Sequence, residues 1–495
     1  MNERNDPRTT VPRLWVWLAA ILLLGLAVRV ATIDYALWYD EVASTKFAAA
    51  PLRQLWSDWM VRETNPPLYY ALLGGWMQAF GDGDRAARGM SIAIGMVGLV
   101  LAFLVGRRVG GDRAGLIATA LIALSSQHVL YSQQVRGYIL GHSAALAAIL
   151  AVLAFLAHSD IDGNSRRRTI ALAGYAATCT IALYSHTMLV LLPALVNVFV
   201  IARLLLARDR RWRALFEWIA ANAVVLLAWS WWARITLLQA TSSSNIQWIG
   251  TPSLLYAVRM TLESYVPWDI GPAQFLVALL ALAAVAHMAW HRRTRPDALL
   301  LPFLALAAPP LLYLLSLKVP VFLNRTIYWP SGPFLIAVAV GIADLRVAQA
   351  RWAAIAVGLL ASVTGLIAWL PKREIEPWPA VVARLQQDPQ DRIVVTRSRG
   401  AAFALHRYCR APDCNLRIFF VPSPAHELWA SDFPVKGSIN EAGLSRFLLG
   451  RRRVTTVIWN GNAPFQHLLP GVHIHIVSFP NDASRSVMIV RWSIP

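Results

Sequence analysis

Residues 14–41 read LWVWLAAILLLGLAVRVATIDYALWYDE, a long apolar run that ends in two adjacent carboxylates. A bilayer-spanning helix needs about 20 predominantly apolar residues, and the run from Leu14 to Ile33 meets that requirement. It is longer than the apolar core of a secretory signal, so we expect an uncleaved first span. Asp40 and Glu41 then lie just beyond the membrane end of that span.

The rest of the chain repeats this apolar pattern. Of its 495 residues, 57% are hydrophobic and only 15% are charged, whereas a soluble domain carries about 25% charged residues. This composition argues against an ordinary cytoplasmic enzyme and excludes a disordered chain. It predicts about eleven spans, near residues 14–33, 86–106, 113–131, 137–158, 169–187, 188–206, 214–234, 273–290, 298–317, 327–345 and 352–370.

The formal net charge of +19 comes mostly from arginines between the apolar runs. Such clusters follow the positive-inside rule, and no basic face for nucleic acid can be drawn without crossing apolar runs. With the N-terminus inside, every strongly basic connection is cytoplasmic, provided that Pro66–Phe80 is an interfacial or re-entrant helix on the outer side. These connections contain Arg107, Arg108, Arg113, Arg166–Arg168, Arg208, Arg210, Arg211, Arg213, Arg292, Arg293, Arg295, Arg346 and Arg351.

The sequence therefore predicts an all-α polytopic membrane domain over residues 1–370 and a small extracytoplasmic α/β domain over residues 371–495. The outer loops of the first domain are predicted at 34–85, 131–136, 235–272 and 316–325. In the second, Trp378–Gln387 is helix-like, and RIVVT, TTVIW, HIHIVSF and SVMIVRW are strand-like. Cys409 and Cys414 are close enough to form a disulfide in an oxidising compartment, and no cysteine or histidine cluster has zinc spacing.

Three carboxylates of the first outer loop are candidates for chemistry. Asp40 and Glu41 follow the first span, and Glu63 precedes Asn65 and two prolines. A carboxylate close to a membrane is costly unless it is paired, solvated or used; it can act as a general base or ligate a metal. The alternative for each is a solvated loop charge.

Polar and basic residues recur at the same outer level. Gln134, Arg136 and Tyr138 fall in a short turn between two spans, and His186 falls in another. Lys318 and Arg325 flank the ninth and tenth predicted spans. Arginine suits a phosphate because its planar fork donates hydrogen bonds in pairs. The alternatives are snorkelling to headgroups for the cations and a structural role for the histidine.

The motifs and their order resemble a known superfamily. WYDE, NPPLYY, GRRVGGDRAGLIA, LYSQQVRGY, LYSHTMLVLL, NRTIYWPSGPFLIAVAVGI and EPWPAVVARLQQ occur in that order between residues 38 and 387. They resemble the GT-C membrane glycosyltransferases, nearest to the bacterial dolichyl-phosphate-mannose-protein mannosyltransferase-like branch, which includes lipid A aminoarabinose transferases. Members of this group take a sugar from a polyprenyl-phosphate donor and invert the anomeric centre.

The resemblance implies roles for individual residues. Asp40 matches the acidic residue that activates the acceptor, with Glu41 as its companion. Arg136 and Arg325 match basic residues that contact the lipid phosphate, and Lys318 is a further candidate there. Glu63, Asn65, Gln134, Tyr138 and His186 are expected to line the substrate pocket. Asn65 and Gln134 stand where the family commonly has His and Glu and are poorer ligands for a transition metal, so we expect a divalent cation to be weakly required or not required.

The sequence predicts an inverting glycosyltransferase of the bacterial cytoplasmic membrane that acts on its outer face. The donor would be a polyprenyl-phosphate sugar, and the acceptor an envelope glycan, lipid or protein. A transporter or flippase for a lipid-linked sugar is the alternative, but transporters often place charges at the midplane and show two repeated halves, and neither is evident here. A non-catalytic membrane scaffold is a third hypothesis.

Overall fold

The computed structural model describes residues 7–159, 164–207, 211–242, 249–267, 270–373, 376–410, 412, 414–422, 433, 435–440, 443, 446, 453–459, 473–479 and 487–493. The chain divides into two compact units. We call the first the helical unit; it comprises Met1–Ile33, Trp56–Leu72 and Arg88–Leu370. The second, the mixed unit, comprises Asp34–Leu55, Leu73–Ala87 and Pro371–Pro495.

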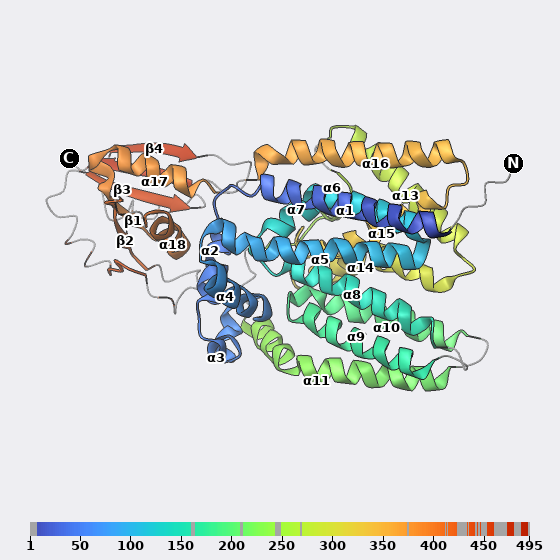
Figure 1. Cartoon of the computed structure of the whole chain (residues 1–495). Helices are drawn as coiled ribbons and strands as arrows, with labels where there is room; N and C mark the ends of the chain where they lie inside the picture. The colour runs from blue at the N-terminus through green and yellow to red at the C-terminus, as the bar shows by residue number, and fades with distance from the viewer. Residues whose placement is uncertain are drawn as a thin grey trace. The chain divides into compact units, whose positions relative to one another are not determined.

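The helical unit is a bundle of long helices that run side by side (Figure 1). Its main helices are α1 (Pro7–Ala31), α5 (Asp84–Gly110), α6 (Asp112–Leu124), α7 (Ser126–Gln133), α8 (Tyr138–Leu156), α9 (Ser165–Leu183), α10 (Leu191–Leu205), α11 (Trp212–Ser242), α12 (Leu254–Tyr265), α13 (Ala273–His291), α14 (Leu300–Ser316), α15 (Ser331–Ala343) and α16 (Ala348–Trp369). The 3₁₀ turn η2 (Thr187–Val190) joins α9 to α10, and η3 (Pro296–Leu299) joins α13 to α14. Two further 3₁₀ turns are η1 (Asp58–Arg62), before α4, and η4 (Leu370–Lys372), directly after α16.

Each apolar run predicted as a span lies on a helix, but the number of clear spans is smaller than eleven. In the described part of the chain, eight helices are long and apolar enough to cross a membrane, or nine if the bent pair α6 and α7 is one span. The two halves of that pair meet at 65°. Two runs fall short for local reasons: α9 starts with three arginines, and α15 has only 13 residues.

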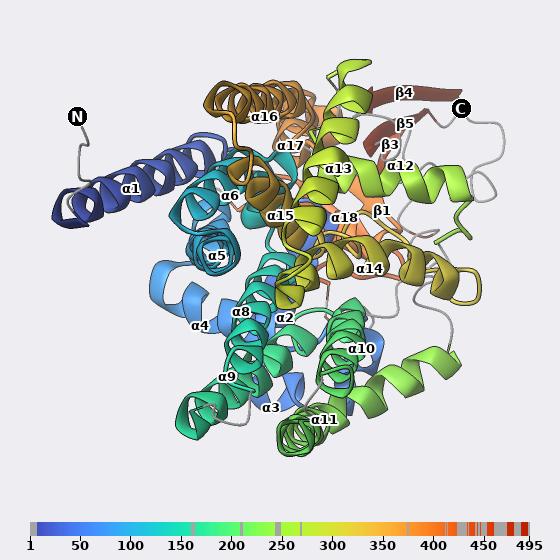
Figure 2. The ribbon, with the colours of Figure 1, turned by 90° about the vertical axis from the view of Figure 1, so that its right-hand side faces the viewer.

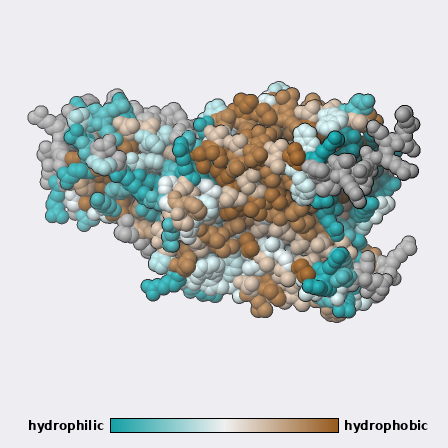
Figure 3. Space-filling view, in the orientation of Figure 1, coloured by the Kyte–Doolittle hydropathy of each residue, from teal (hydrophilic) through white to brown (hydrophobic). Residues whose placement is uncertain are grey.

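The surface of the helical unit shows why these helices need lipid. Large apolar side chains on the outer helices are exposed to 60–75%, among them Leu23 of α1, Leu227 of α11, Leu279 of α13 and Leu360 of α16. Figure 3 shows a broad hydrophobic surface over the middle of the bundle. An apolar surface this extensive is not left in water by a soluble monomer. The chain is a multi-pass membrane protein.

Helix α15 forms the centre of the bundle. All residues from Ser331 to Ile342 are buried, and Figure 2 shows the helix between α6, α13 and α14. Small residues allow this close approach, since a Cβ at Gly341 would lie 2.0 Å from the carbonyl oxygen of Ala284 in α13. Helix α15 is too short to count as a span by length, yet the other helices pack around it.

The basic connections of the helical unit meet at one end of the bundle. Three ion pairs connect neighbouring loops or helix ends, at closest distances of 2.5 to 2.9 Å. They are Arg168–Glu217, Arg203–Asp297 and Arg292–Asp344. Arg292 also donates to the carbonyl of Val109 at 2.7 Å, which adds the connection between α5 and α6. These contacts agree with the expectation that the arginine-rich loops share one side.

The segment predicted as an interfacial or re-entrant helix forms α4 (Leu68–Phe80). Its 13 residues are too few to cross a bilayer of ordinary thickness. Two prolines, Pro66 and Pro67, precede it, and Pro67 supplies the carbonyl that accepts the first helical N–H at 3.0 Å. The helix begins in the helical unit and ends in the mixed unit.

The mixed unit combines helices with one five-stranded sheet. Its helices are α2 (Tyr39–Ala48), α3 (Leu52–Leu55), α17 (Trp378–Gln387) and α18 (Arg399–Tyr408), with the turn η5 (Pro389–Arg392). Its strands are β1 (Ile393–Thr396), β2 (Arg417–Phe420), β3 (Arg453–Trp459), β4 (His473–Phe479) and β5 (Val487–Ser493), in the spatial order β2-β1-β3-β5-β4. Strand β1 pairs in parallel with β2 and β3, whereas β5 is antiparallel to both its neighbours.

The predicted α/β character of this unit is confirmed. Helix α17 has the predicted bounds because Trp378, Val381, Val382 and Leu385 recur at helical spacing on one buried face. Cys409 and Cys414 form the expected disulfide, with Cα atoms 5.3 Å apart. Helix α18 and strand β2 were not predicted; the helix begins with arginine and carries His-Arg-Tyr near its end, and the strand has only four residues.

Candidate functional site

In the helical unit, Glu63 is the centre of a buried polar cluster. The residue is only 6% exposed. Oε1 accepts hydrogen bonds from Nδ2 of Asn65 at 2.7 Å and from the hydroxyl of Tyr70 at 3.1 Å. Gln239 of α11 donates to the backbone carbonyl of Glu63 at 2.6 Å and so connects the Glu63 segment to α11. The alternative of a solvated loop charge therefore does not hold for Glu63.

Arg136 joins this cluster from a distant part of the chain. It is also 6% exposed, with Nη2 4.0 Å from Oε1 of Glu63 and Nη1 donating to the hydroxyl of Tyr70 at 3.3 Å. Burial raises the pKa of the Tyr70 phenol well above its ordinary value, so this hydroxyl stays protonated between the two charges. Snorkelling to headgroups, the alternative for Arg136, does not describe a guanidinium held inside the protein.

The turn that carries Arg136 is shaped by Gly137. A Cβ at this position would lie 2.4 Å from the carbonyl oxygen of Ser185, so only glycine permits the contact. Gln134 supplies backbone rather than side-chain contacts here: its carbonyl accepts from Oγ of Ser91 at 2.7 Å and from the N–H of Arg136 at 2.8 Å. The close approach brings the Arg136 turn against the segment that contains His186.

His186 lies beside the Arg136 turn. Its ring centroid is 5.3 Å from that of Tyr138, and the Arg136 guanidinium lies 5.8 Å from the Tyr138 centroid. Nδ1 of His186 accepts the N–H of Met188 at 3.2 Å. Burial, with further effects from Arg325 and Arg136, lowers the pKa of His186 to about 3. The imidazole is therefore neutral, and both predicted phosphate-binding arginines act on it electrostatically.

The hydroxyl of Tyr138 is buried and has no hydrogen-bond partner among the residues that the structure describes. The side chain as a whole is 4% exposed. A buried hydroxyl without a partner costs about 1–3 kcal/mol, and such groups point to a function or to an absent partner. Tyr138 can donate to an anionic oxygen brought to Arg136.

In the mixed unit, the predicted carboxylates start helix α2. Glu41 is fully buried and accepts the backbone N–H of Trp38 at 3.2 Å, which satisfies a free donor at the helix start. The backbone carbonyl of Asp40 accepts from Oγ of Ser44 at 3.0 Å, and Asp40 is less buried than Glu41. The two adjacent acids therefore differ in burial and in role. Glu41 stabilises the start of the helix, whereas Asp40 is more accessible to solvent.

The sequence and the fold of the chain are both similar to those of known proteins. The family model for dolichyl-phosphate-mannose-protein mannosyltransferases matches residues 64–233. The crystal structure of ArnT from Cupriavidus metallidurans bound to undecaprenyl phosphate is similar over 96% of this chain and 98% of that chain, with a TM-score of 0.64 and 16% identity. The chain has the GT-C membrane glycosyltransferase fold.

A second GT-C structure is more distantly similar. The Archaeoglobus fulgidus oligosaccharyltransferase tethered to an acceptor peptide matches 83% of this chain and 64% of that chain, with a TM-score of 0.54 and 12% identity. No curated protein sequence matches the chain. The family match covers Asn65, Arg136, Tyr138 and His186 but not Asp40.

Lys318 lies apart from the cluster. It is an exposed residue just beyond α14, and its backbone N–H donates to the carbonyl of Leu315 at 3.1 Å. Within the part of the chain that the structure describes, no contact links it to Arg136 or Glu63. Its assignment to the donor phosphate stays a prediction, with less structural support than that of Arg325.

Glu376 is a residue that sequence reasoning missed. It is fully buried in the mixed unit. Oε2 accepts from the backbone N–H of Tyr39 at 2.8 Å and from Nε1 of Trp378 at 2.7 Å, and Oε1 accepts from Nε1 of Trp459 at 2.8 Å. The Tyr39 ring stacks on Trp459 with centroids 4.4 Å apart. Glu376 thus holds the residue that precedes Asp40, and its place in the EPWP motif was the only available signal.

The donor atoms of the helical-unit cluster do not suit a divalent cation. Oε1 of Glu63 already accepts three hydrogen bonds and faces a guanidinium, and Asn65 and Gln134 offer neutral amides. Among the described residues, no three His, Cys, Asp or Glu side chains gather as a possible metal site. The expectation that a divalent cation is weakly required or not required stays a prediction.

Proposed function

We propose that the chain is an inverting glycosyltransferase that moves a sugar from a polyprenyl-phosphate donor to a hydroxyl or amine of an envelope acceptor. The observation that supports this most is the buried Arg136, held between Glu63 and Tyr70 beside Tyr138, whose hydroxyl has no hydrogen-bond partner among the described residues. A guanidinium and a free O–H donor together match the oxygens of a phosphate. The similarity to ArnT bound to undecaprenyl phosphate supports the same donor class.

On the donor side, Arg136 and Arg325 would stabilise the phosphate as it leaves. Charge develops on the phosphate oxygen when its bond to the anomeric carbon breaks. Fixed cationic donors aimed at developing charge usually make the largest single contribution to catalysis. Glu63 and Tyr70 hold Arg136 in place before the substrate arrives, so little reorganisation is needed during the reaction. Tyr138 would add one hydrogen bond to the same group.

On the acceptor side, Asp40 would act as the general base. The acceptor oxygen or nitrogen gives its proton to the Asp40 carboxylate and forms a bond to the anomeric carbon on the face opposite the phosphate. The bond from that carbon to the phosphate oxygen breaks, and polyprenyl phosphate leaves with the electron pair. Glu41 would act through its hydrogen bond to Trp38, which positions the start of α2.

The arginine-rich end of the bundle supports the orientation. Short loops rich in arginine face the cytoplasm, and ion pairs gather these loops at one end of the helical unit. The turns that contain Arg136 and His186 join the opposite helix ends. The reaction is therefore proposed for the periplasmic side of a bacterial cytoplasmic membrane.

A transfer assay tests this function. The purified full-length protein in lipid receives a panel of polyprenyl-phosphate sugars and candidate acceptors, and mass spectrometry follows released polyprenyl phosphate and glycosylated acceptor. Wild type should release polyprenyl phosphate in a sugar-dependent way, and Arg136→Gln should lose this activity. Movement of intact lipid-linked sugar across sealed vesicles without any release would instead identify a transporter.

A further inference from the structure

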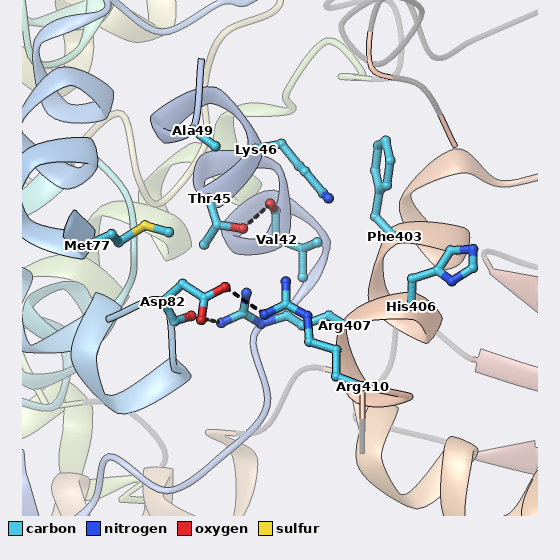
Figure 4. Close-up of a pocket in the computed structure, with 10 residues that line it drawn as sticks. All are labelled: Val42, Thr45, Lys46, Ala49, Met77, Asp82, Phe403, His406, Arg407 and Arg410. Carbon is cyan, nitrogen blue, oxygen red and sulfur yellow. Dashed lines mark hydrogen bonds and ion pairs between the residues drawn. The ribbon is translucent and has the colours of Figure 1, made fainter. Parts of the chain in front are cut away.

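The mixed unit contains a cavity of about 170 Å³ between α2, α18 and the end of α4 (Figure 4). Its floor is formed by buried side chains such as Val42 and Phe403, and Asp82 and Arg410 at its rim are exposed. Its volume is more than ten times the roughly 10–15 Å³ that a cavity needs on this measure to hold one water. The lining residues are Val42, Thr45, Lys46, Ala49, Met77, Asp82, Phe403, His406, Arg407 and Arg410.

Two of the three cations in this cavity are neutralised by carboxylates. Arg407 pairs with Asp84 at 2.6 Å, and Arg410 pairs with Asp82 at 2.6 Å. His406 contributes no charge at neutral pH, because burial lowers its pKa while its Nε2 donates to the carbonyl of Lys436 at 2.9 Å. The arginines are therefore balanced, and the imidazole is neutral.

Lys46 is the cation that remains in excess. Among the described residues it has no carboxylate within ion-pair distance, and its ammonium lies 4.7 Å from the centre of the Phe403 ring. Burial and then repulsion from Arg410 and Arg407 lower its pKa, and attraction from Asp82 offsets only part of this shift. Figure 4 shows the side chain extending across the cavity toward Phe403. A positive group held against two other positive groups favours an anion beside it.

The cavity is separate from the residue assigned to the acceptor base. Val42, Thr45, Lys46 and Ala49 line it, and their spacing of three, four and seven residues places them on one face of α2. Asp40 precedes Val42 by two residues, which is about 200° around a helix. Asp40 is therefore on the opposite face of α2, so a ligand in this cavity is a second ligand, not the reacting hydroxyl.

We propose that this cavity binds a phosphate group, with Lys46 as its principal cation. Lysine and arginine are the usual phosphate ligands in proteins. The Lys46 ammonium supplies a point charge, and the guanidinium groups of Arg407 and Arg410 supply further N–H donors. Oγ1 of Thr45 is at the same wall, although its hydrogen is given to the carbonyl of Val42 at 2.8 Å. The phosphate belongs either to a lipid headgroup or to a soluble phosphorylated molecule.

Two binding experiments on the full-length protein in phosphate-free maltoside detergent test the proposal without any transferase activity. Isothermal titration with inorganic phosphate measures the soluble source. Native mass spectrometry with dioleoyl phosphatidic acid, against dioleoylglycerol as the phosphate-free lipid, measures the headgroup source. In the Arg136→Gln background, which removes the proposed donor-phosphate site outside this cavity, saturable binding of one equivalent of either phosphate probe, and not of dioleoylglycerol, is expected. Binding of both probes assigns recognition to the phosphate alone, and binding of one identifies the source.

Matched variants locate the site. Lys46→Gln should weaken binding of the phosphate probe by about tenfold or more, the usual effect of losing a hydrogen bond to a charged group, and Lys46→Arg should retain it. Arg53→Gln removes the same charge from an exposed position of the mixed unit outside the cavity and should bind like wild type. Equal binding by wild type and Lys46→Gln, equal weakening by Arg53→Gln, or no saturable binding of either probe would overturn the proposal.

Discussion

The carboxylate of Glu376 accepts a 2.8 Å hydrogen bond from the backbone N–H of Tyr39, which lies 337 positions earlier in the chain. Two tryptophan indoles donate to the same carboxylate. A Cβ on Gly400 of α18 would collide with the Tyr39 ring at 1.7 Å. The start of α2, and with it Asp40, is therefore held by residues from the C-terminal part of the chain.

Glu376→Gln is expected to loosen this arrangement. The amide replaces one acceptor oxygen with a donor that faces another donor, and an unsatisfied buried group costs about 1–3 kcal/mol. We expect a lower thermal midpoint and a lower kcat with the donor KM little changed, because Asp40 is displaced rather than removed. Trp459→Phe keeps an aromatic ring, although a smaller one, against Tyr39 and removes only one of the three donors to Glu376, so it should show a smaller loss in both measurements. A kcat equal to wild type in Glu376→Gln would refute the positioning role.

Asp40→Asn should fold normally and lose most turnover. An amide cannot accept the acceptor proton, and removal of a general base lowers rates by about 10²–10⁴-fold. The measurement is the release of polyprenyl phosphate with saturating donor and acceptor, beside the thermal midpoint. Glu41→Gln is the comparison: it should lower stability more than Asp40→Asn does, because Glu41 is fully buried and binds the Trp38 N–H. Near wild-type turnover in Asp40→Asn would contradict its assignment as the base.

Tyr138→Phe is expected to weaken donor binding without destabilising the protein. Its hydroxyl has no hydrogen-bond partner among the described residues, so deletion breaks no internal bond. A hydrogen bond to a charged phosphate contributes about 1.5–3 kcal/mol, which corresponds to at least a tenfold rise in the donor Kd. The control is Tyr70→Phe, whose hydroxyl contacts both Glu63 and Arg136 and which should lose stability as well. Unchanged donor affinity in Tyr138→Phe would remove this residue from the phosphate site.

Because of His186, the stability of the protein should fall as the pH is lowered. Its pKa in the folded chain is about 3, below the value near 6.5 of an exposed histidine, so the unfolded chain binds the proton more readily. The resulting stability is complete above about pH 6.5 and is lost progressively as the pH falls toward 3. His186→Asn does not titrate and can still accept the Met188 N–H, so its thermal midpoint should fall less between pH 6.5 and 4. Parallel curves for the two proteins would show that His186 is not held neutral.

Two aspartates of the mixed unit form a matched test of ion pairs. Asp84 accepts from Arg407 and from the hydroxyl of Tyr408, each at 2.6 Å, and the Arg407 side chain is only 7% exposed. Asp34 pairs with Arg85, and both of these side chains are more than half exposed. Exposed pairs contribute about 0–1 kcal/mol, so Asp34→Asn should shift the thermal midpoint little, whereas Asp84→Asn should lower it clearly. Equal shifts would mean that the Asp84 contacts do not persist in solution.

The sequence predicted most of the helices because their signals are local. Apolar length located the spans, and one buried face fixed α17 at its observed bounds. Fewer described helices than the predicted eleven are both long and apolar enough to count as spans by length and composition, because a buried central helix such as α15 is apolar without being long. Composition alone does not separate burial in protein from burial in lipid.

The candidate site was predicted in part. One cluster in the helical unit contains five of the predicted residues: Glu63, Asn65, Arg136, Tyr138 and His186. The sequence predicted that they would lie together because it placed all of them at the outer ends of the spans. The inward burial of Glu63 could not be foreseen, since it depends on Gln239 of a helix far along the chain. Glu376 was missed for the same reason: its function exists only once Tyr39 and Trp459 are beside it.

The mixed unit is assembled from three separate stretches of chain, two of which interrupt the helical unit in the sequence. A fragment that starts at Pro371 would therefore lack α2, and with it the Tyr39 ring that covers Trp459 and the N–H that Glu376 binds. Conversely, a chain cut at Leu370 would leave the buried face of α2, including Val42 and Phe47, without its covering. The boundary at residue 370 is thus a boundary in sequence and not in folding, and exchange of the C-terminal region between related enzymes would have to carry the first loop with it.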